Sequence, residues 1–416
     1  MAKKIMLSLL SGLVILVITW KYQNYDYSLA LEDNFIKKMF MFKDNIYAAP
    51  SKAKAEFVFI NTGKDLALVE DTIEYGNVAV SDREKIYRFI SYLNSLNEKP
   101  LFNVIDIQFY FPFTKDLQVD SLLQAELAKN DNTLIPILKM PGGDYKAPLY
   151  KARYAYSNYR TFGPVFNKFR VMNEDEIPSI PRILHQSISK AVYRDHFFFP
   201  TCNGRPCLSA LWPDYYLRDR DIRGVNYETD GQRIKKNDPR PAQGNIKTQY
   251  YNIGEILFDL DAGKEKYNKF FGDKIVIIGN FEDDIHVTPV GKMAGPVLLA
   301  NIYLSLLNGE HIISYWLVVV LILAFSVLSY IALFRKMPEI KLKFDFLFSS
   351  FVNKFIKGYI SYFGCMFLLS LLVLLIFNNQ VALFLPSLIF TGIEYMRQKK
   401  YKSKPAEGTP VTRKQL

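Results

Sequence analysis

An apolar segment without a single charged residue, Ile312–Phe334, constrains this chain more than any other feature. A helix crosses a lipid bilayer in roughly 20 residues, so the segment is long enough to be a membrane span. The residues before it predict a strand, an acidic loop and a helix. Lys274–Ile278 is short and rich in branched apolar residues, which is typical of a strand buried on both faces of a sheet. Gly295 and Pro296 then begin an amphipathic helix that Gly309 ends, so a folded unit leads directly into the span.

Three further apolar segments predict additional membrane helices, which makes four in all. The first lies in residues 1–24, the second is Tyr359–Phe377 and the third is Val381–Met396. We interpret the first as an uncleaved anchor rather than a signal peptide. The sequence that most resembles a cleavage site, at residues 28–30, lies well beyond the apolar run, and the aromatic residues before it are typical of a membrane interface.

Lysine and arginine gather in three segments that we place in the cytoplasm, because basic residues favour that side of a membrane. The N-terminus carries two lysines, the loop 335–358 six basic residues against two acidic ones, and the tail 397–416 seven against one. These segments and Glu394 account for the net charge of +11, so the region between the first two spans, residues 21–311 with the large domain, is neutral. With four spans, both termini are cytoplasmic and this domain is extracytoplasmic. The charge is then a topology signal that needs no nucleic acid, although the same residues are suited to anionic lipid headgroups.

Alternating strand and helix patterns in residues 25–311 predict an α/β fold with a mostly parallel sheet and flanking helices. Pro136 favours an edge strand or a strand end over a central position. A capping box at residues 81–84 is expected to begin one of the helices. The expected strands are Glu56–Ile60, Leu101–Ile107 and Thr133–Leu138, and the expected helices include Asp120–Lys129, Ser179–Val192, Ile253–Leu260 and one within Tyr25–Tyr47.

Two cysteines of the large domain, Cys202 and Cys207, are separated by Asn-Gly-Arg-Pro. So close a pair in an oxidising compartment predicts a disulfide. Two free thiols or a metal site are the alternatives, but a metal would require more cysteine or histidine partners nearby than His196 alone. We therefore expect no metal. The third cysteine, Cys365, falls within a predicted span.

The chain resembles the second type of CHASE domain, an extracellular sensor of bacterial membrane receptors. The resemblance rests on the order of several short segments: KIVIIGN from Lys274, the Thr288-Pro289 loop, the helix with Ala300-Asn301, and NVIDIQFYFP from Asn103. It implies a multi-pass protein of the bacterial inner membrane whose large domain is periplasmic or extracellular. Family members often carry a cytoplasmic kinase or cyclase after the last span, whereas the tail 397–416 is too short to fold into one. Any output is then expected to pass to a membrane or periplasmic protein partner.

Candidate ligand-binding residues lie beyond the ends of two predicted strands. Asp283, Asp284 and His286 follow one strand, and Asp106 lies near the carboxyl end of another. Open α/β sheets bind ligands at that edge, so a metal or a small polar ligand is a coherent hypothesis, with a solvated acidic loop as the alternative. Asn301 completes the set, although a structural hydrogen bond to the loop after the strand is the favoured role for it.

No sequence motif indicates an enzyme. The chain has no glycine-rich phosphate loop, no nucleophile elbow and no pair of histidines at metal-ligand spacing, so we expect no catalytic residues and no cofactor. The favoured function is a sensor or signalling subunit without its own catalytic domain. The alternative is a structural or assembly subunit of a bacterial cell-envelope complex, with the aromatic segment Phe197–Tyr216 as its interface. Homo-oligomerisation stays open.

Overall fold

The computed structural model divides the chain into two compact units, which are considered separately here. One unit contains Met1–Glu32 and Ile313–Leu416, and the other contains Asp33–Ile312. The residues that the structure describes are 1–23, 30–46, 51–71, 76–107, 109, 116–139, 145–146, 152–157, 166, 168–171, 177–194, 196, 200–219, 222, 245–263, 267, 269–337 and 350–402. Most of the charged segment Arg218–Arg240 and part of the aromatic segment Phe197–Tyr216 lie outside them.

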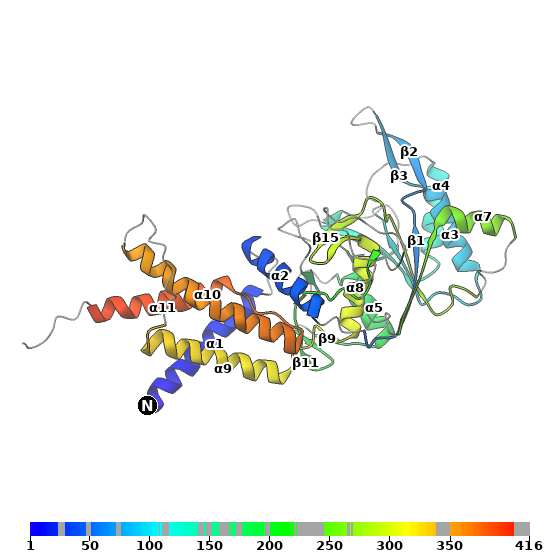
Figure 1. Cartoon of the computed structure of the whole chain (residues 1–416). Coiled ribbons are helices and arrows are strands. Elements are labelled where there is room, and N and C mark those ends of the chain that lie inside the picture. Colours follow the sequence, from blue (N-terminus) through cyan, green and yellow to red (C-terminus); the bar gives the residue numbers. More distant parts are fainter. Residues whose placement is uncertain are drawn as a thin grey trace, which may run out of the picture. The chain divides into compact units, whose positions relative to one another are not determined.

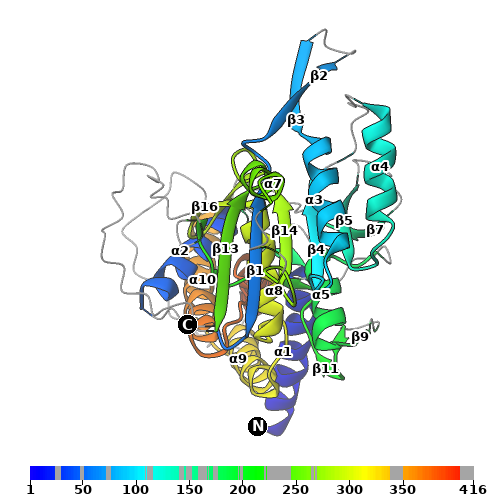
Figure 2. The same cartoon turned by 90° about the vertical axis from the view of Figure 1, so that its right-hand side faces the viewer.

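The second unit is built on a seven-stranded sheet, in which only β6 runs antiparallel to its neighbour. Its order is β13-β1-β14-β4-β5-β6, with β7 also paired to β5 (Figure 2). The predicted α/β fold with a mostly parallel sheet is therefore confirmed. The strands are β1 (Ala55–Asn61), β4 (Phe102–Asp106), β5 (Thr133–Lys139), β6 (Tyr145–Lys146), β7 (Arg153–Tyr156), β13 (Ile246–Asn252) and β14 (Ile275–Gly279).

Helices cover both faces of this sheet because its central strands are apolar on both sides. In β14, Val276 and Ile278 pack into one core cluster, and Ile275 and Ile277 pack into another, as the two-residue period of a strand requires. The first face is covered by α3 (Arg83–Ser95), α4 (Leu117–Leu127) and α7 (Ile253–Asp261), and the second by α5 (Ile180–Ser189) and α8 (Gly295–Leu307) (Figure 1).

Two helices of this unit differ from their predicted form. The N-cap of α3 is Asp82, whose carboxylate accepts bonds from the backbone N–H of Glu84 and Lys85; Ser81 instead ends a strand. Helix α8 is buried on every side from its first residue to Leu306, so the prediction of an amphipathic helix is wrong. A helix that is apolar all round belongs inside a protein, and α8 lies between the sheet and the segments laid over it.

Strand β5 is not at an edge, although Pro136 favoured that position. β4 pairs with β5 only at Thr133 and Leu134, and beyond that point β5 continues beside β7, with Pro136 opposite Ala155. Proline cannot donate a backbone hydrogen bond, so it is tolerated where one of the two ladders has ended. The sequence therefore indicated correctly that Pro136 has a missing strand pairing on one side, but β5 as a whole is not an edge strand.

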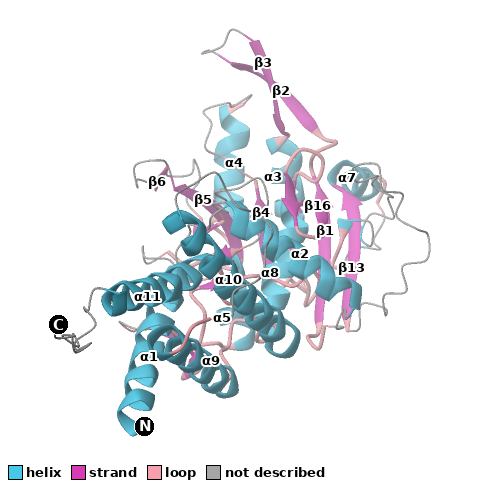
Figure 3. Ribbon diagram, turned by 60° about the vertical axis from the view of Figure 1, so that its left-hand side comes forward, coloured by secondary structure: helices cyan, strands magenta, loops and turns pink. Residues whose placement is uncertain are grey.

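Short antiparallel strand pairings, which the sequence did not predict, complete the second unit. They are β2 (Leu66–Asp71) with β3 (Gly76–Ser81), β8 (Phe169–Arg170) with β12 (Ala210–Leu211), β9 (Tyr193–Arg194) and β11 (Arg205–Pro206) on either side of β10 (Thr201–Cys202), and β15 (Ile285–Thr288) with β16 (Gly291–Ala294). Figure 3 shows the strands β2 and β3 extending beyond the main sheet. The predicted Thr288-Pro289 turn joins β15 to β16, and the Thr288 hydroxyl donates to the carbonyl of Gly291 at 2.7 Å.

The first unit contains the apolar helices α1 (Ala2–Gln23), α9 (Tyr315–Phe334) and α10 (Ser350–Phe377). Helices α1 and α9 cross closely at Gly12, where an added Cβ would lie 2.7 Å from the backbone nitrogen of Ser326. Small residues allow such close approach between membrane helices. Helix α2 (Ala30–Ile46) is shared between the two units.

Three helices of the described residues are long and apolar enough to span a membrane, and the prediction of four is wrong on this point. The exception is α11 (Phe384–Lys402). Its uncharged part, from Phe384 to Ile393, rises only about 15 Å, which is short of the roughly 30 Å hydrocarbon core. Five charged residues fall in its second half: Glu394, Arg397, Lys399, Lys400 and Lys402. With three spans the termini would lie on opposite sides, so the cytoplasmic placement of both is not confirmed.

Candidate functional site

The carboxyl ends of four adjacent parallel strands meet along one rung of the main sheet. The register places Asn252 of β13 opposite Asn61 of β1, Asn61 opposite Gly279 of β14, and Gly279 opposite Asp106 of β4. Three polar side chains and one glycine therefore line this edge. The sequence predicted Asp106 for this position and missed Asn61 and Asn252.

The same edge is a topological switch point. After β14 the chain passes to α8 on one face of the sheet, whereas after the neighbouring strands β1 and β4 it passes to α3 and α4 on the other. Open α/β sheets bind ligands where adjacent strands connect to opposite faces, because the loops part there. The candidate residues Asp106, Asp284 and His286 lie at this point.

Asp284 and His286 form an ion pair beside Asp106, with 3.1 Å between Asp284 Oδ1 and His286 Nε2. Asp106 Oδ2 is buried and has no hydrogen-bond partner among the described residues. Burial raises the pKa of Asp106 to about 8, and the negative charge of Asp284 raises it further than His286 lowers it. Burial alone would lower the pKa of His286, but the hydrogen bond to Asp284 and the charges of Asp284 and Asp106 together outweigh burial and raise it. At neutral pH the group therefore contains a protonated Asp106.

Two glycines allow this group to lie against the first turn of α8. A Cβ at Gly295 would overlap the carboxylate of Asp284, and one at Gly279 would lie 2.5 Å from Pro296 Cγ. Asp284 also accepts the backbone N–H of Gly295 at 2.8 Å through its carbonyl oxygen. Anionic side chains are stabilised at the positive end of a helix dipole, which is where Asp284 lies.

Two predicted site residues do not join the group. Asp283 is exposed, and its carboxylate accepts a hydrogen bond from the side chain of Asn280. Asn301 is buried in α8, where its side chain bonds the backbone N–H and C=O of Leu217 at 2.8 and 2.9 Å. Asn301 therefore has a structural role, as the sequence favoured, but it holds the segment at Leu217 and not the loop after β14 that the sequence suggested.

Asn61 organises the loops at the sheet edge. Its side-chain nitrogen donates to Asn252 Oδ1 and Glu282 Oε1, and its oxygen accepts the backbone N–H of Gly63 and Phe281. These four bonds tie the loop after β1 to the loop after β14. The available signal was the Asn-Thr-Gly sequence directly after a buried strand, which is typical of a turn anchored by its own side chain.

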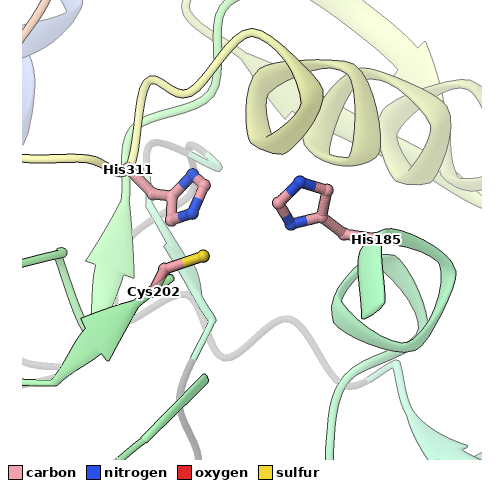
Figure 4. A group of neighbouring side chains, drawn as sticks. All are labelled: His185, Cys202 and His311. Carbon is pink, nitrogen blue, oxygen red and sulfur yellow. The ribbon is translucent and has the colours of Figure 1, made fainter. Parts of the chain in front are cut away.

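A second polar group lies elsewhere in the same unit, and sequence reasoning missed it. His185, Cys202 and His311 are all buried, and one potential ligand atom from each lies within 4.8 Å of the others (Figure 4). They come from α5, from β10 and from the chain between α8 and α9. The hydroxyl of Tyr193 lies 2.8 Å from His185 Nδ1 and 3.3 Å from His311 Nε2. Burial lowers the pKa of both histidines, to about 4 for His185 and about 3 for His311, so both rings are neutral at pH 7.

No disulfide joins Cys202 to Cys207 in the structure, so the predicted disulfide is not supported. Asn203 and Gly204 have positive φ and form a two-residue hairpin turn in which Cys202 pairs with Arg205. Because Arg205 lies opposite Cys202, Cys207 lies two residues further along the partner strand. The two cysteines are therefore diagonal neighbours. Diagonal neighbours lie roughly 7–8 Å apart, whereas a disulfide requires Cβ atoms about 3.5–4.5 Å apart.

One comparison with known proteins gives a match. A family model described as the CHASE2 domain matches residues 70–334, which is more than half of the chain. The range contains both polar groups described above and extends through α9. Comparison with curated proteins and with solved structures finds no match.

Proposed function

The chain belongs to the CHASE2 family, and from this premise we propose that it is a membrane-anchored sensor subunit that passes ligand binding to its membrane helices. CHASE2 domains are extracellular sensor domains, and three helices of this chain are long and apolar enough to span a membrane. In the proposal the second unit is extracytoplasmic, in a bacterial inner membrane. The signal passes to a protein partner that supplies the output.

The observation that carries the proposal is the path of α8. The helix begins at Gly295, in contact with Asp284 at the sheet edge, and its 13 residues span about 20 Å. After Leu307 the chain folds back on the helix end, where Glu310 N–H donates to the carbonyl of Ser305 at 3.1 Å. Residues 313–314 then lead into α9. A buried, hydrogen-bonded helix therefore joins the candidate site covalently to a membrane span.

The chemistry of the sheet edge favours a small ligand with a cationic group. Asp106 holds a proton only because its burial and the charge of Asp284 penalise a second carboxylate. A bound ammonium group would supply the missing positive charge, and Asp106 would then release its proton. Its unpartnered Oδ2 is the acceptor available to such a ligand.

Hydrogen–deuterium exchange on the full chain in mild detergent tests this proposal, with free amino acids and polyamines as probes. We expect an active probe to slow exchange at the sheet edge and in residues 308–314. Asp284→Asn should abolish both effects. Asp283→Asn is the matched control and should retain them, because this neighbouring carboxylate points to Asn280. Protection that survives Asp284→Asn, or that never reaches residues 308–314, contradicts the proposal.

The alternative function, a structural subunit of an envelope complex, used the aromatic segment Phe197–Tyr216 as an interface. Several described residues of this segment are buried in the core of the second unit, among them Cys202, Cys207 and Leu211. Substitutions there would disturb the fold as well as any interface. Stoichiometric co-purification of a partner with the full chain in mild detergent remains the test of this alternative.

A further inference from the structure

We propose that His185, Cys202 and His311 bind one zinc ion, and that the ion ties the connection between α8 and α9 to α5 and to the β10 hairpin. The site is separate from the sheet edge and does not depend on a ligand there. It would make the membrane-proximal end of α8 responsive to zinc.

The first argument is convergence. The three residues are far apart in the sequence, yet their side chains point toward one another from three different elements (Figure 4). β10 pairs with β9, which puts Tyr193 opposite Cys202, and the backbone N–H of Leu208 donates to the carbonyl of His311 at 2.8 Å. Backbone hydrogen bonds therefore hold the cysteine and one histidine in place, and α5 presents the other.

The second argument is ligand chemistry. Two neutral imidazoles and a thiolate are a ligand set that zinc prefers, and three protein ligands with a fourth position left for water are common in zinc proteins. Zinc bonds of about 2.0–2.1 Å to nitrogen and about 2.3 Å to sulfur place tetrahedral ligand atoms about 3.3–3.6 Å apart. The ligand atoms now lie within 4.8 Å of one another, so they would need to approach by roughly 1 Å.

The third argument is the hydrogen bonding of Tyr193. Its hydroxyl oxygen is placed to accept from His185 Nδ1 and His311 Nε2, and its proton to be donated to Cys202. Figure 4 shows that the ring nitrogens on this side of the histidines are the ones that face Cys202. One hydroxyl oxygen therefore already gathers the two nitrogens that a zinc ion beside Cys202 would bind. The ion would take His185 Nδ1 and His311 Nε2 from the hydroxyl, with each neutral ring carrying its proton on the other nitrogen.

The test is a metal titration of the full chain in mild detergent after treatment with a chelator. With Zn²⁺ alone as the probe, we expect one ion per chain and, at a hundredfold excess over Kd, a rise in Tm of roughly 5–10 °C. Co²⁺ in place of zinc should give a thiolate-to-cobalt charge-transfer band. Cys202→Ser should remove that band and weaken zinc binding at least about tenfold. Cys365→Ser is the matched control, because this thiol lies in α10, and should change neither.

Three results would overturn the inference. The first is a wild-type protein that gives no charge-transfer band with Co²⁺, an outcome that does not depend on whether any variant folds. The second is zinc binding that Cys202→Ser leaves unchanged. The third is a Cys202–Cys207 disulfide in the isolated protein, detected by mass spectrometry without reduction, because it would consume the thiolate.

Discussion

Replacing Asp106 with asparagine should remove most of the alkaline sensitivity of the second unit. The ordinary pKa of this carboxyl is 3.8, and burial beside Asp284 raises it to about 8. A group whose pKa is raised on folding binds its proton more tightly in the folded state. The free energy of unfolding is therefore highest below pH 3.8 as far as Asp106 is concerned, and it falls as the pH rises to about 8.

The magnitude follows from the size of the shift. One pKa unit corresponds to about 1.4 kcal/mol, so ionising Asp106 in the folded domain costs on the order of 5 kcal/mol. For a domain of this size that amounts to roughly 10–20 °C in Tm between pH 4 and pH 8. Asparagine has nearly the same shape and no titrating proton, so Asp106→Asn should be the more stable protein at pH 8.

The assay is thermal unfolding of the full chain in mild detergent, followed by tryptophan fluorescence from pH 4 to pH 9. The Tm of the wild type should fall as the pH rises through this range, and the Tm of Asp106→Asn should fall much less. A smaller slope should remain in the variant, because His286 also has a raised pKa and its contribution is lost as the pH rises above 6.5. Asp283→Asn, which removes an exposed carboxylate, should retain the wild-type slope. Equal slopes for the wild type and Asp106→Asn would refute the reasoning.

Three other substitutions test separate contacts. Gly12→Leu should separate α1 from α9, because even a Cβ at this position would lie 2.7 Å from the backbone nitrogen of Ser326. Disulfide cross-linking between cysteines introduced on the two helices should then fall. Unchanged cross-linking would contradict the close crossing. Gly295→Ala should displace the Asp284 carboxylate and lower the free energy of unfolding by about 1–3 kcal/mol in chemical denaturation, whereas a neutral result would mean that Asp284 is not held there. Asp82→Ala should cost about 1 kcal/mol in the same assay, through loss of the α3 cap, and no loss would argue against this capping contact.

The sequence predicted the central strands because each is short, apolar and buried on both faces. It placed Asp106 and Asp284 at the same edge because parallel strands end together, and the structure brings them close enough for the charge of Asp284 to raise the pKa of Asp106. It did not predict that β14 lies between β1 and β4. Strand order depends on which crossovers can pack together, and the residues of one strand do not record its neighbours.

The missed residues share a physical cause. His185, Cys202 and His311 meet only because a helix, a hairpin and a connection pack against one another, so no spacing in the sequence brings them together. The predicted disulfide failed for a related reason: the distance between the two cysteines along the chain was short, but the hairpin register placed them diagonally. The fourth span was predicted from hydrophobicity, whereas the charges that begin at Glu394 shorten its apolar part.

The burial of α8 limits how it can transmit a signal. Asn301 holds Leu217, Ser305 Oγ accepts the backbone N–H of Asp214, and the Asp219 carboxylate accepts that of Ala294 at the start of the helix. Sliding α8 alone would break all of these bonds inside the core, where unpaired polar groups are costly. The helix and the segment 214–219 must therefore move together, and the bonds between them are conserved in any permitted motion. In the proposed sensor, a ligand at the sheet edge would act on this larger body and not on the helix alone. The chain passes from α8 to α9 through the connection that contains His311.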